Sequence, residues 1–128
     1  MILVDTTVLV DCLRTSDAKL LSLLQTQTAI VCGVVRAEIL HGSRDPAHRG
    51  KLIRFLNSMW QVSLPEMVWN AVGDNLAELR RHGVTVPFSD AVLATLAIVL
   101  DVELWARDRH FPAIQTVLPR LRLFQEPP

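Results

Sequence analysis

The stretch MILVDTTVLVD, residues 1–11, sets a carboxylate between two apolar runs. Residues 2–4 have the continuous apolar character of a short strand covered on both faces, and residues 8–10 resume it after Asp5. A carboxylate in such surroundings is costly unless a hydrogen-bond donor or a cation compensates it. Asp5 is therefore the first candidate functional residue, and capping of a following helix is the alternative explanation.

Similar apolar stretches recur along the chain and alternate with segments of helical character. This alternation predicts an α/β domain with a parallel sheet, and the length of 128 residues suits one domain over residues 1–128. The expected strands are 2–4, 29–31, 61–64, 102–105 and 121–124, and the expected helices are 34–43, 65–82, 89–101 and 109–117.

Two of these helices carry start signals. Ser63, Pro65 and Glu66 form a capping-box pattern for the helix over 65–82, and Ser89 is the expected N-cap of the next helix. The segment DAVLATLAIVL that follows Ser89 is apolar on nearly all sides, which predicts a buried helix. The acid at its start, Asp90, is therefore as unusual as Asp5.

Composition narrows the class of protein. Half of the residues are hydrophobic and the formal net charge is zero, so neither disorder nor a strongly charged partner is indicated. Cys12 and Cys32 match no zinc or CxxC spacing, which favours buried thiols in a reducing compartment. No signal peptide is visible, and the longest apolar run, residues 91–100, is too short to span a bilayer. We expect a cytoplasmic protein without a membrane partner.

Four acids lie where an α/β domain would bring them together. Asp5 and Asp108 follow expected strands, Asp90 begins a buried helix, and Glu38 projects from an expected helix toward its apolar face. Ligand sites of open parallel sheets lie outside the carboxyl ends of the strands. Taken singly, Asp5 and Asp108 have helix capping as an alternative, and Asp90 has a favourable charge at a helix N-terminus. For Glu38 the alternative is a buried pair with an arginine.

Clustered carboxylates repel one another unless a cation is present, and hard divalent ions such as Mg²⁺ and Mn²⁺ prefer oxygen ligands. Such ions support phosphodiester hydrolysis by activating water and stabilising the leaving oxygen. The sequence contains no glycine-rich phosphate loop and no convincing catalytic triad. A receiver-type phosphorylation switch also gathers acids, but Lys19 and Lys51 come too early for the lysine that such a switch needs.

Four segments carry a family resemblance: MILVDTTVLVD, VVRAEILHGSR, PFSDAVLATLA and LWARDRHF. With this order and spacing, the chain resembles the PIN-domain ribonucleases, most closely the VapC toxins of bacterial VapBC toxin–antitoxin pairs, over essentially its whole length. The resemblance implies a three-layer α/β/α fold around about five parallel strands. It also implies metal-dependent cleavage of RNA by an acidic pocket that holds Mg²⁺ or Mn²⁺, formed by Asp5, Glu38, Asp90 and Asp108.

The resemblance further implies a supporting hydroxyl at Thr7. The family often has Thr or Ser two residues before its last aspartate, where this chain has Ala106, so one supporting hydrogen bond is expected to be missing. This departure leaves room for a catalytically inactive PIN module that binds a protein or RNA. A nuclease directed at DNA is a further alternative.

The neutral formal charge can hide a separation of charge between the expected acidic pocket and the rest of the chain. Setting the four acids aside leaves 13 basic against 9 acidic residues, a net of +4. Basic side chains near the expected pocket are candidates for contacts to RNA phosphates, and ordinary surface arginines are the alternative. These candidates are Arg14, Arg36, Arg44, Arg107 and Arg109.

The resemblance implies partners as well: a cognate antitoxin, a second copy in a homodimer, and an RNA substrate for which transfer RNA is one candidate. An apolar surface is expected over residues 59–72, which contain Trp60 and Trp69, and it suits a dimer or another partner. His41 and His110 are candidate metal or proton-transfer groups, but both are expected to be surface residues without an essential role.

Overall fold

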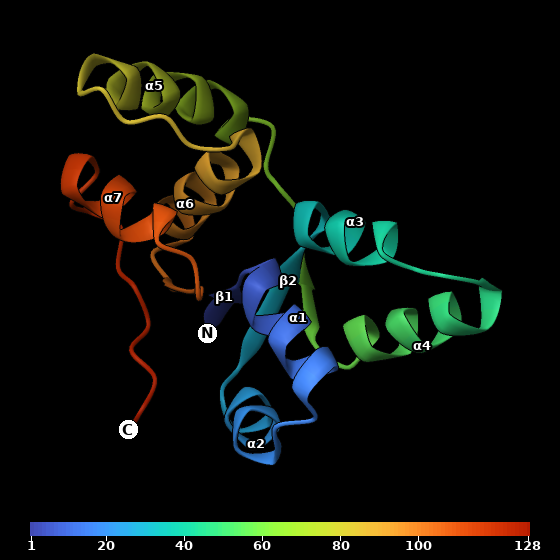
Figure 1. Cartoon of the computed structure of the whole chain (residues 1–128). Coiled ribbons are helices and arrows are strands. Elements are labelled where there is room, and N and C mark those ends of the chain that lie inside the picture. Colours follow the sequence, from blue (N-terminus) through green and yellow to red (C-terminus); the bar gives the residue numbers. More distant parts are fainter.

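The computed structural model describes the whole chain, residues 1–128. Its centre is a sheet of four parallel strands in the order β3-β2-β1-β4. The helices surround this sheet (Figure 1). The strands are β1 (Ile2–Val4), β2 (Ala29–Cys32), β3 (Trp60–Val62) and β4 (Glu103–Trp105). The helices are α1 (Thr6–Thr15), α2 (Ala18–Thr26), α3 (Gly33–His41), α4 (Pro46–Asn57), α5 (Val68–Arg81), α6 (Phe88–Leu100) and α7 (His110–Val117). The predicted α/β class with a parallel sheet is confirmed.

The strand β1 lies inside the sheet and is buried along its whole length. Leu3 pairs with Ile30 of β2 on one side and with Leu104 of β4 on the other. Burial on both faces explains its continuous apolar sequence. Of the fifth predicted strand, 121–124, only a single bridge between Leu104 and Leu123 forms.

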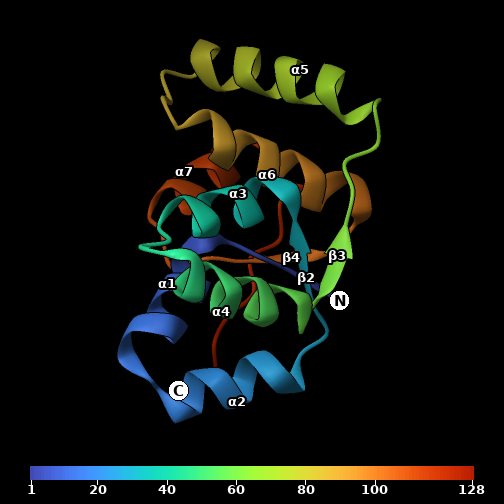
Figure 2. The same cartoon turned by 90° about the vertical axis from the view of Figure 1, so that its right-hand side faces the viewer.

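Helices cover both faces of this sheet. Figure 2 shows α5 and α6 above the strands, with α4 and α2 below them. The helix α6 is the most buried, because every side chain from Asp90 to Ala97 is shielded from solvent. This result confirms the expectation from its all-round apolar sequence. None of the helices is long and apolar enough to cross a membrane.

The predicted helix starts differ from the structure. The helix α5 begins at Val68 after a turn closed by the bond from Val68 N to Pro65 O, and no side chain caps it, so the capping-box prediction is wrong. Ser89 lies inside α6 rather than at its N-cap, and the backbone of Pro87 takes that place. Proline restricts the chain before both helices, and this restraint outweighs the side-chain signals.

Three helices absent from the predicted set, α1, α2 and α4, begin at aspartates. The carboxylates of Asp5, Asp17 and Asp45 accept hydrogen bonds from backbone N–H groups in the first turns of these helices. Aspartate is a preferred N-cap because it satisfies donors that the helix itself leaves unpaired. The capping explanation of Asp5 is therefore correct in geometry, and it also fixes this carboxylate at the end of β1.

Candidate metal centre

Asp5 is held at the carboxyl edge of the sheet by its backbone and its side chain. Its N–H donates to Trp105 O at 2.8 Å, which continues the pairing of β1 with β4. Its Oδ2 accepts hydrogen bonds from Thr7 N at 3.2 Å and Thr7 Oγ1 at 2.6 Å. Asp5 is only 3% exposed, so these bonds orient a carboxylate that has little contact with water.

Asp90 and Asp108 meet at the imidazole of His110. His110 Nδ1 lies 2.8 Å from Asp90 Oδ2 and 3.1 Å from Asp108 Oδ1. Asp108 Oδ1 also accepts the backbone N–H of His110 at 2.8 Å. One ligand atom from each of these three residues lies within 4.8 Å of the others, an arrangement that suits a metal ion.

The three aspartates influence one another electrostatically. Burial raises the pKa of Asp5, against the hydrogen bonds from Thr7 that lower it, and the charge of Asp108 adds to the increase. Burial also raises the pKa of Asp90 to about 6; the hydrogen bond from His110 opposes this rise, and the charges of Asp5 and Asp108 add to it. A divalent cation would remove this repulsion, because it favours the charged forms.

No lysine or arginine forms an ion pair with Asp5, Asp90 or Asp108. The nearest basic group of the cluster is the ring of His110, whose side chain is 37% exposed. Three carboxylates without a permanent cation, two of them buried, are a donor set that fits Mg²⁺ or Mn²⁺.

Glu38 lies outside the group formed by Asp90, Asp108 and His110, in a more exposed position. It lies on α3, where Val35 and Ile39 form the buried side, and its carboxylate faces solvent. The expectation that Glu38 points to the apolar face is wrong, because the buried stripe of α3 is narrow and Glu38 lies beside it. Glu38 Oε1 accepts a hydrogen bond from Thr6 Oγ1 at 2.9 Å, which ties it to the residue next to Asp5.

Two of the predicted basic residues share a pocket with Glu38. Arg14 of α1 and Arg44, in the turn before α4, are exposed and line this pocket, which has a volume of about 540 Å³ and also includes Lys51. Arg109 is exposed beside Asp108. Arg36 Nη1 donates instead to Gln61 Oε1 at 3.3 Å.

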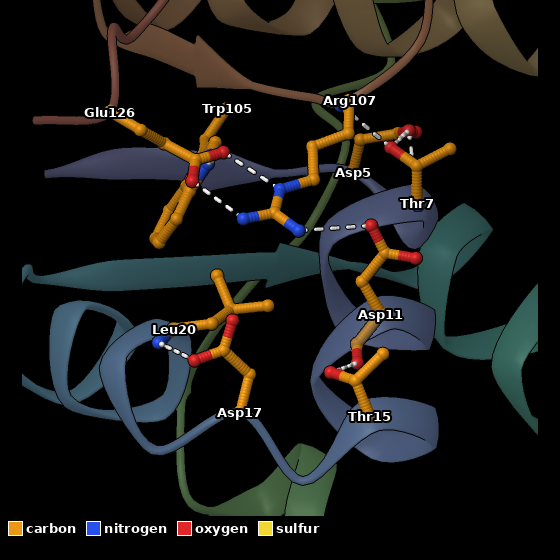
Figure 3. Close-up of polar contacts among 9 residues, drawn as sticks. All are labelled: Asp5, Thr7, Asp11, Thr15, Asp17, Leu20, Trp105, Arg107 and Glu126. Carbon is orange, nitrogen blue, oxygen red and sulfur yellow. Dashed lines mark hydrogen bonds and ion pairs between the residues drawn. The ribbon is translucent and has the colours of Figure 1, made fainter. Parts of the chain in front are cut away.

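Arg107 is engaged within the chain, which sequence reasoning did not anticipate (Figure 3). Its Nε and Nη2 donate to the two oxygens of Glu126 at 2.8 and 2.6 Å, and its Nη1 donates to Asp11 Oδ2 at 3.0 Å. Its backbone N–H donates to Thr7 Oγ1 at 2.9 Å. With its guanidinium paired twice, Arg107 is a poor candidate for contacting RNA.

The two predicted surface histidines differ. His41 is exposed, as expected. The ring of His110 is instead half-buried and bridges Asp90 and Asp108, so the expectation of an ordinary surface residue is wrong. The only sequence signal was its position two residues after Asp108, which permits the local bond from His110 N to the Asp108 carboxylate.

A model of the PIN domain family matches residues 2–116. The chain belongs to the PIN domain family. Its fold is similar to that of VapBC2 from Rickettsia felis, which was solved bound to a DNA fragment from the promoter. The two sequences are 21% identical, the match covers 97% of this chain and 98% of that chain, and the TM-score is 0.83.

Two further solved structures are similar. One is FitAcB from Neisseria gonorrhoeae, with 18% identity, 98% and 97% of the two chains covered, and a TM-score of 0.79. The other is VapC20 from Mycobacterium tuberculosis, described as a sarcin-ricin loop cleaving toxin, with 17% identity, 88% and 94% covered, and a TM-score of 0.68. Among curated protein sequences, none matches this chain.

Proposed function

We propose that this PIN domain is a metal-dependent endoribonuclease and the toxin of a toxin–antitoxin pair. The observation that carries this proposal is the convergence of Asp5, Asp90 and Asp108 at one edge of the sheet without an arginine or lysine to neutralise them. Burying several acids without a permanent cation lowers stability, and the N-cap role of Asp5 explains only one of the three.

Asp5, Asp90 and Asp108 would hold Mg²⁺ or Mn²⁺, with Glu38 at the open side. Such an ion, when bound, lowers the pKa of water and stabilises charge on the leaving oxygen of a phosphodiester. Thr7 fixes the Asp5 carboxylate through its hydroxyl. Thr6 holds Glu38 at the rim, where its carboxylate can orient the attacking water or contribute to a second cation.

The pocket beside Glu38 suits an RNA strand. Arg14, Arg44 and Lys51 surround it, and Val10 and Leu13 contribute apolar walls. Cations on a rim next to an acidic centre attract phosphates while the scissile bond is placed at the acids. The description of VapC20 as a toxin that cleaves the sarcin-ricin loop supports RNA rather than DNA as the substrate class. Transfer RNA is one candidate for the target.

Partner surfaces are part of the same proposal. Trp60 at the start of β3, and Met67 and Trp69 at the start of α5, are exposed apolar side chains that suit a homodimer contact. Several of the similar structures are toxin–antitoxin complexes, which supports a cognate antitoxin as a second partner. We expect the protein to act in the cytoplasm, where RNA targets and such complexes occur.

A catalytically inactive PIN module is the second candidate. The missing hydroxyl at Ala106 favours it, since loss of a supporting hydrogen bond weakens metal sites. However, the hydroxyl of Thr7 supports Asp5 directly at 2.6 Å, so the centre retains one such bond. An inactive module would keep its fold and cleave nothing in Mn²⁺ or Mg²⁺.

The test compares wild type with Asp5→Asn and with Asp74→Asn, which makes the same charge change at an exposed position on α5. Each variant is expressed briefly and the RNA ends are sequenced, and each purified protein is incubated with labelled RNA and DNA of one sequence. We expect cleavage of RNA by wild type and Asp74→Asn only. Identical RNA cleavage maps for wild type and Asp5→Asn would refute the proposal, and cleavage of the DNA would indicate a nuclease directed at DNA instead.

A further inference from the structure

We propose that His110 is a nitrogen ligand of the metal held by Asp90 and Asp108, and that it makes the site prefer Mn²⁺ over Mg²⁺. The inference rests on the metal site of the proposed function and adds its specificity. From the sequence alone, His110 is one of two candidate metal or proton-transfer histidines, and an ordinary surface position is expected for it.

The distances fit coordination of one ion. Ligand atoms about 2.1 Å from an octahedral ion lie roughly 3 Å apart when they occupy neighbouring positions. His110 Nδ1 lies 2.8 Å from the nearest oxygen of Asp90 and 3.1 Å from that of Asp108. The nitrogen is therefore already spaced from both oxygens as two neighbouring ligands would be.

The ring is fixed by the fold. His110 is the first residue of α7, and its backbone N–H is bonded to Asp108 Oδ1. The next residue, Phe111, is fully buried and anchors the helix start in the core. Asp90 is placed equally firmly, in the first turn of the buried helix α6. Two helices thus set the nitrogen and the carboxylate opposite each other, and little rearrangement is needed when a cation enters.

The nitrogen decides which cations suit the site. Mg²⁺ is a hard ion that prefers oxygen ligands and keeps its waters, whereas Mn²⁺ accepts imidazole together with carboxylates. A site made only of Asp5, Asp90 and Asp108 would discriminate weakly between the two ions. Adding one imidazole increases the affinity for Mn²⁺ without a matching gain for Mg²⁺.

The alternative is that His110 only forms a hydrogen-bonded pair with Asp90 and Asp108. Both roles need the same contacts in the metal-free protein, so stability alone does not separate them. They differ once Mn²⁺ is bound: a ligand nitrogen couples magnetically to the ion, whereas a paired imidazole outside the coordination sphere does not.

The experiment is pulsed electron paramagnetic resonance of Mn²⁺ bound to the full chain, with and without ¹⁵N-histidine, combined with calorimetric titration of Mn²⁺ and Mg²⁺. Wild type is compared with His110→Gln, His110→Asp and the exposed control His41→Gln. Circular dichroism and thermal melting identify the folded variants. His110→Asp is the second variant because it replaces the nitrogen with an oxygen ligand.

We expect a histidine nitrogen coupling in wild type and in His41→Gln, and none in the two His110 variants. The ratio of Mn²⁺ to Mg²⁺ affinity should fall about 10-fold in His110→Gln. In His110→Asp we expect Mg²⁺ affinity to be retained and the ratio to fall similarly. This inference alone is overturned if wild type binds Mn²⁺ without a nitrogen coupling, or if the ratio of Mn²⁺ to Mg²⁺ affinity is unchanged in both His110 variants. If wild type does not bind Mn²⁺ at all, the proposed function is overturned as well.

Discussion

Two groups of carboxylates lie near the same edge of the sheet, and the Thr7 hydroxyl donates to Asp5 of one group and accepts the backbone N–H of Arg107 from the other. On one side, Asp11 and Glu126 surround the guanidinium of Arg107 (Figure 3). On the other, Asp5 accepts the Thr7 hydroxyl and lies close to Asp90 and Asp108. The first group has its cation within the chain, whereas the second has only the imidazole of His110.

The carboxyl pKa shifts in the two groups have opposite directions. The hydrogen bonds from Arg107 lower the pKa of Glu126, whereas burial raises the pKa of Asp90 to about 6. The Arg107 group therefore stabilises the fold at neutral pH and fastens the C-terminal segment to β4 and α1. We expect the aspartate group to lower stability when no cation is bound. An acid cluster that reduces stability and is nevertheless built into buried elements is a strong indicator of function.

The largest expected effect comes from removing one acid of the unpaired group. Asp90→Asn should lower RNA cleavage at least about 100-fold, since it removes a ligand that no other side chain replaces. In metal-free buffer its melting temperature should not fall, because repulsion with Asp5 and Asp108 is relieved. Cleavage assays and thermal melting measure the two effects. A large loss of metal-free stability would show that Asp90 is structural.

Removing the cation of the paired group should have the opposite signature. Arg107→Ala leaves Asp11 and Glu126 without their partner, and we expect the free energy of unfolding to fall by about 1–2 kcal/mol, since these groups are partly exposed. Urea unfolding measures this change, with the exposed Arg120→Ala as the control. An unchanged stability with lost RNA affinity would restore Arg107 as an RNA-binding residue.

Thr7 links the two groups, and its hydroxyl is expected to act mainly on the metal site. Thr7→Val keeps the side-chain shape and removes the bond to Asp5 Oδ2, so Mn²⁺ affinity should fall about 10-fold. Thr7→Ser keeps the hydroxyl and should bind Mn²⁺ like wild type. Calorimetric titration gives the three affinities, and equal values in all three proteins would remove Thr7 from the site.

The smallest effect is a dependence of stability on pH that differs between the groups. A carboxyl whose pKa is raised on folding binds more protons in the native state, so metal-free stability should decrease by about 1 kcal/mol from pH 5 to pH 7 through Asp90. Glu126, whose pKa is lowered, contributes stability above about pH 4.5 that is lost on further acidification.

Thermal melts of wild type and Asp90→Asn at several pH values test this contrast. The decrease between pH 5 and 7 should be smaller in Asp90→Asn, and saturating Mn²⁺ should reverse it in wild type because the cation competes with protons. A wild-type stability that rises from pH 5 to 7 without metal, equally in both proteins, would contradict the electrostatic description of the aspartate group.

Much of the fold follows from local patterns. Residues 2–4 and the segment after Ser89 are apolar without interruption, and both prove to be buried elements of the core. Helix starts were less predictable, since Pro65 and Pro87 restrict the backbone independently of the capping side chains. The last predicted strand shrinks to one bridge at Leu123, because pairing at an edge depends on the rest of the sheet.

The order of the chain alone determined that Asp5, Asp90 and Asp108 follow or begin core elements, because strand and helix periodicity is local and parallel strands end at one edge. Only the tertiary structure decided which charges are paired. Arg107 finds Asp11 96 residues away and Glu126 19 residues away, and His110 meets Asp90 20 residues away. Such contacts depend on how segments that are far apart in the sequence pack together in the fold, and local sequence periodicity does not encode that packing.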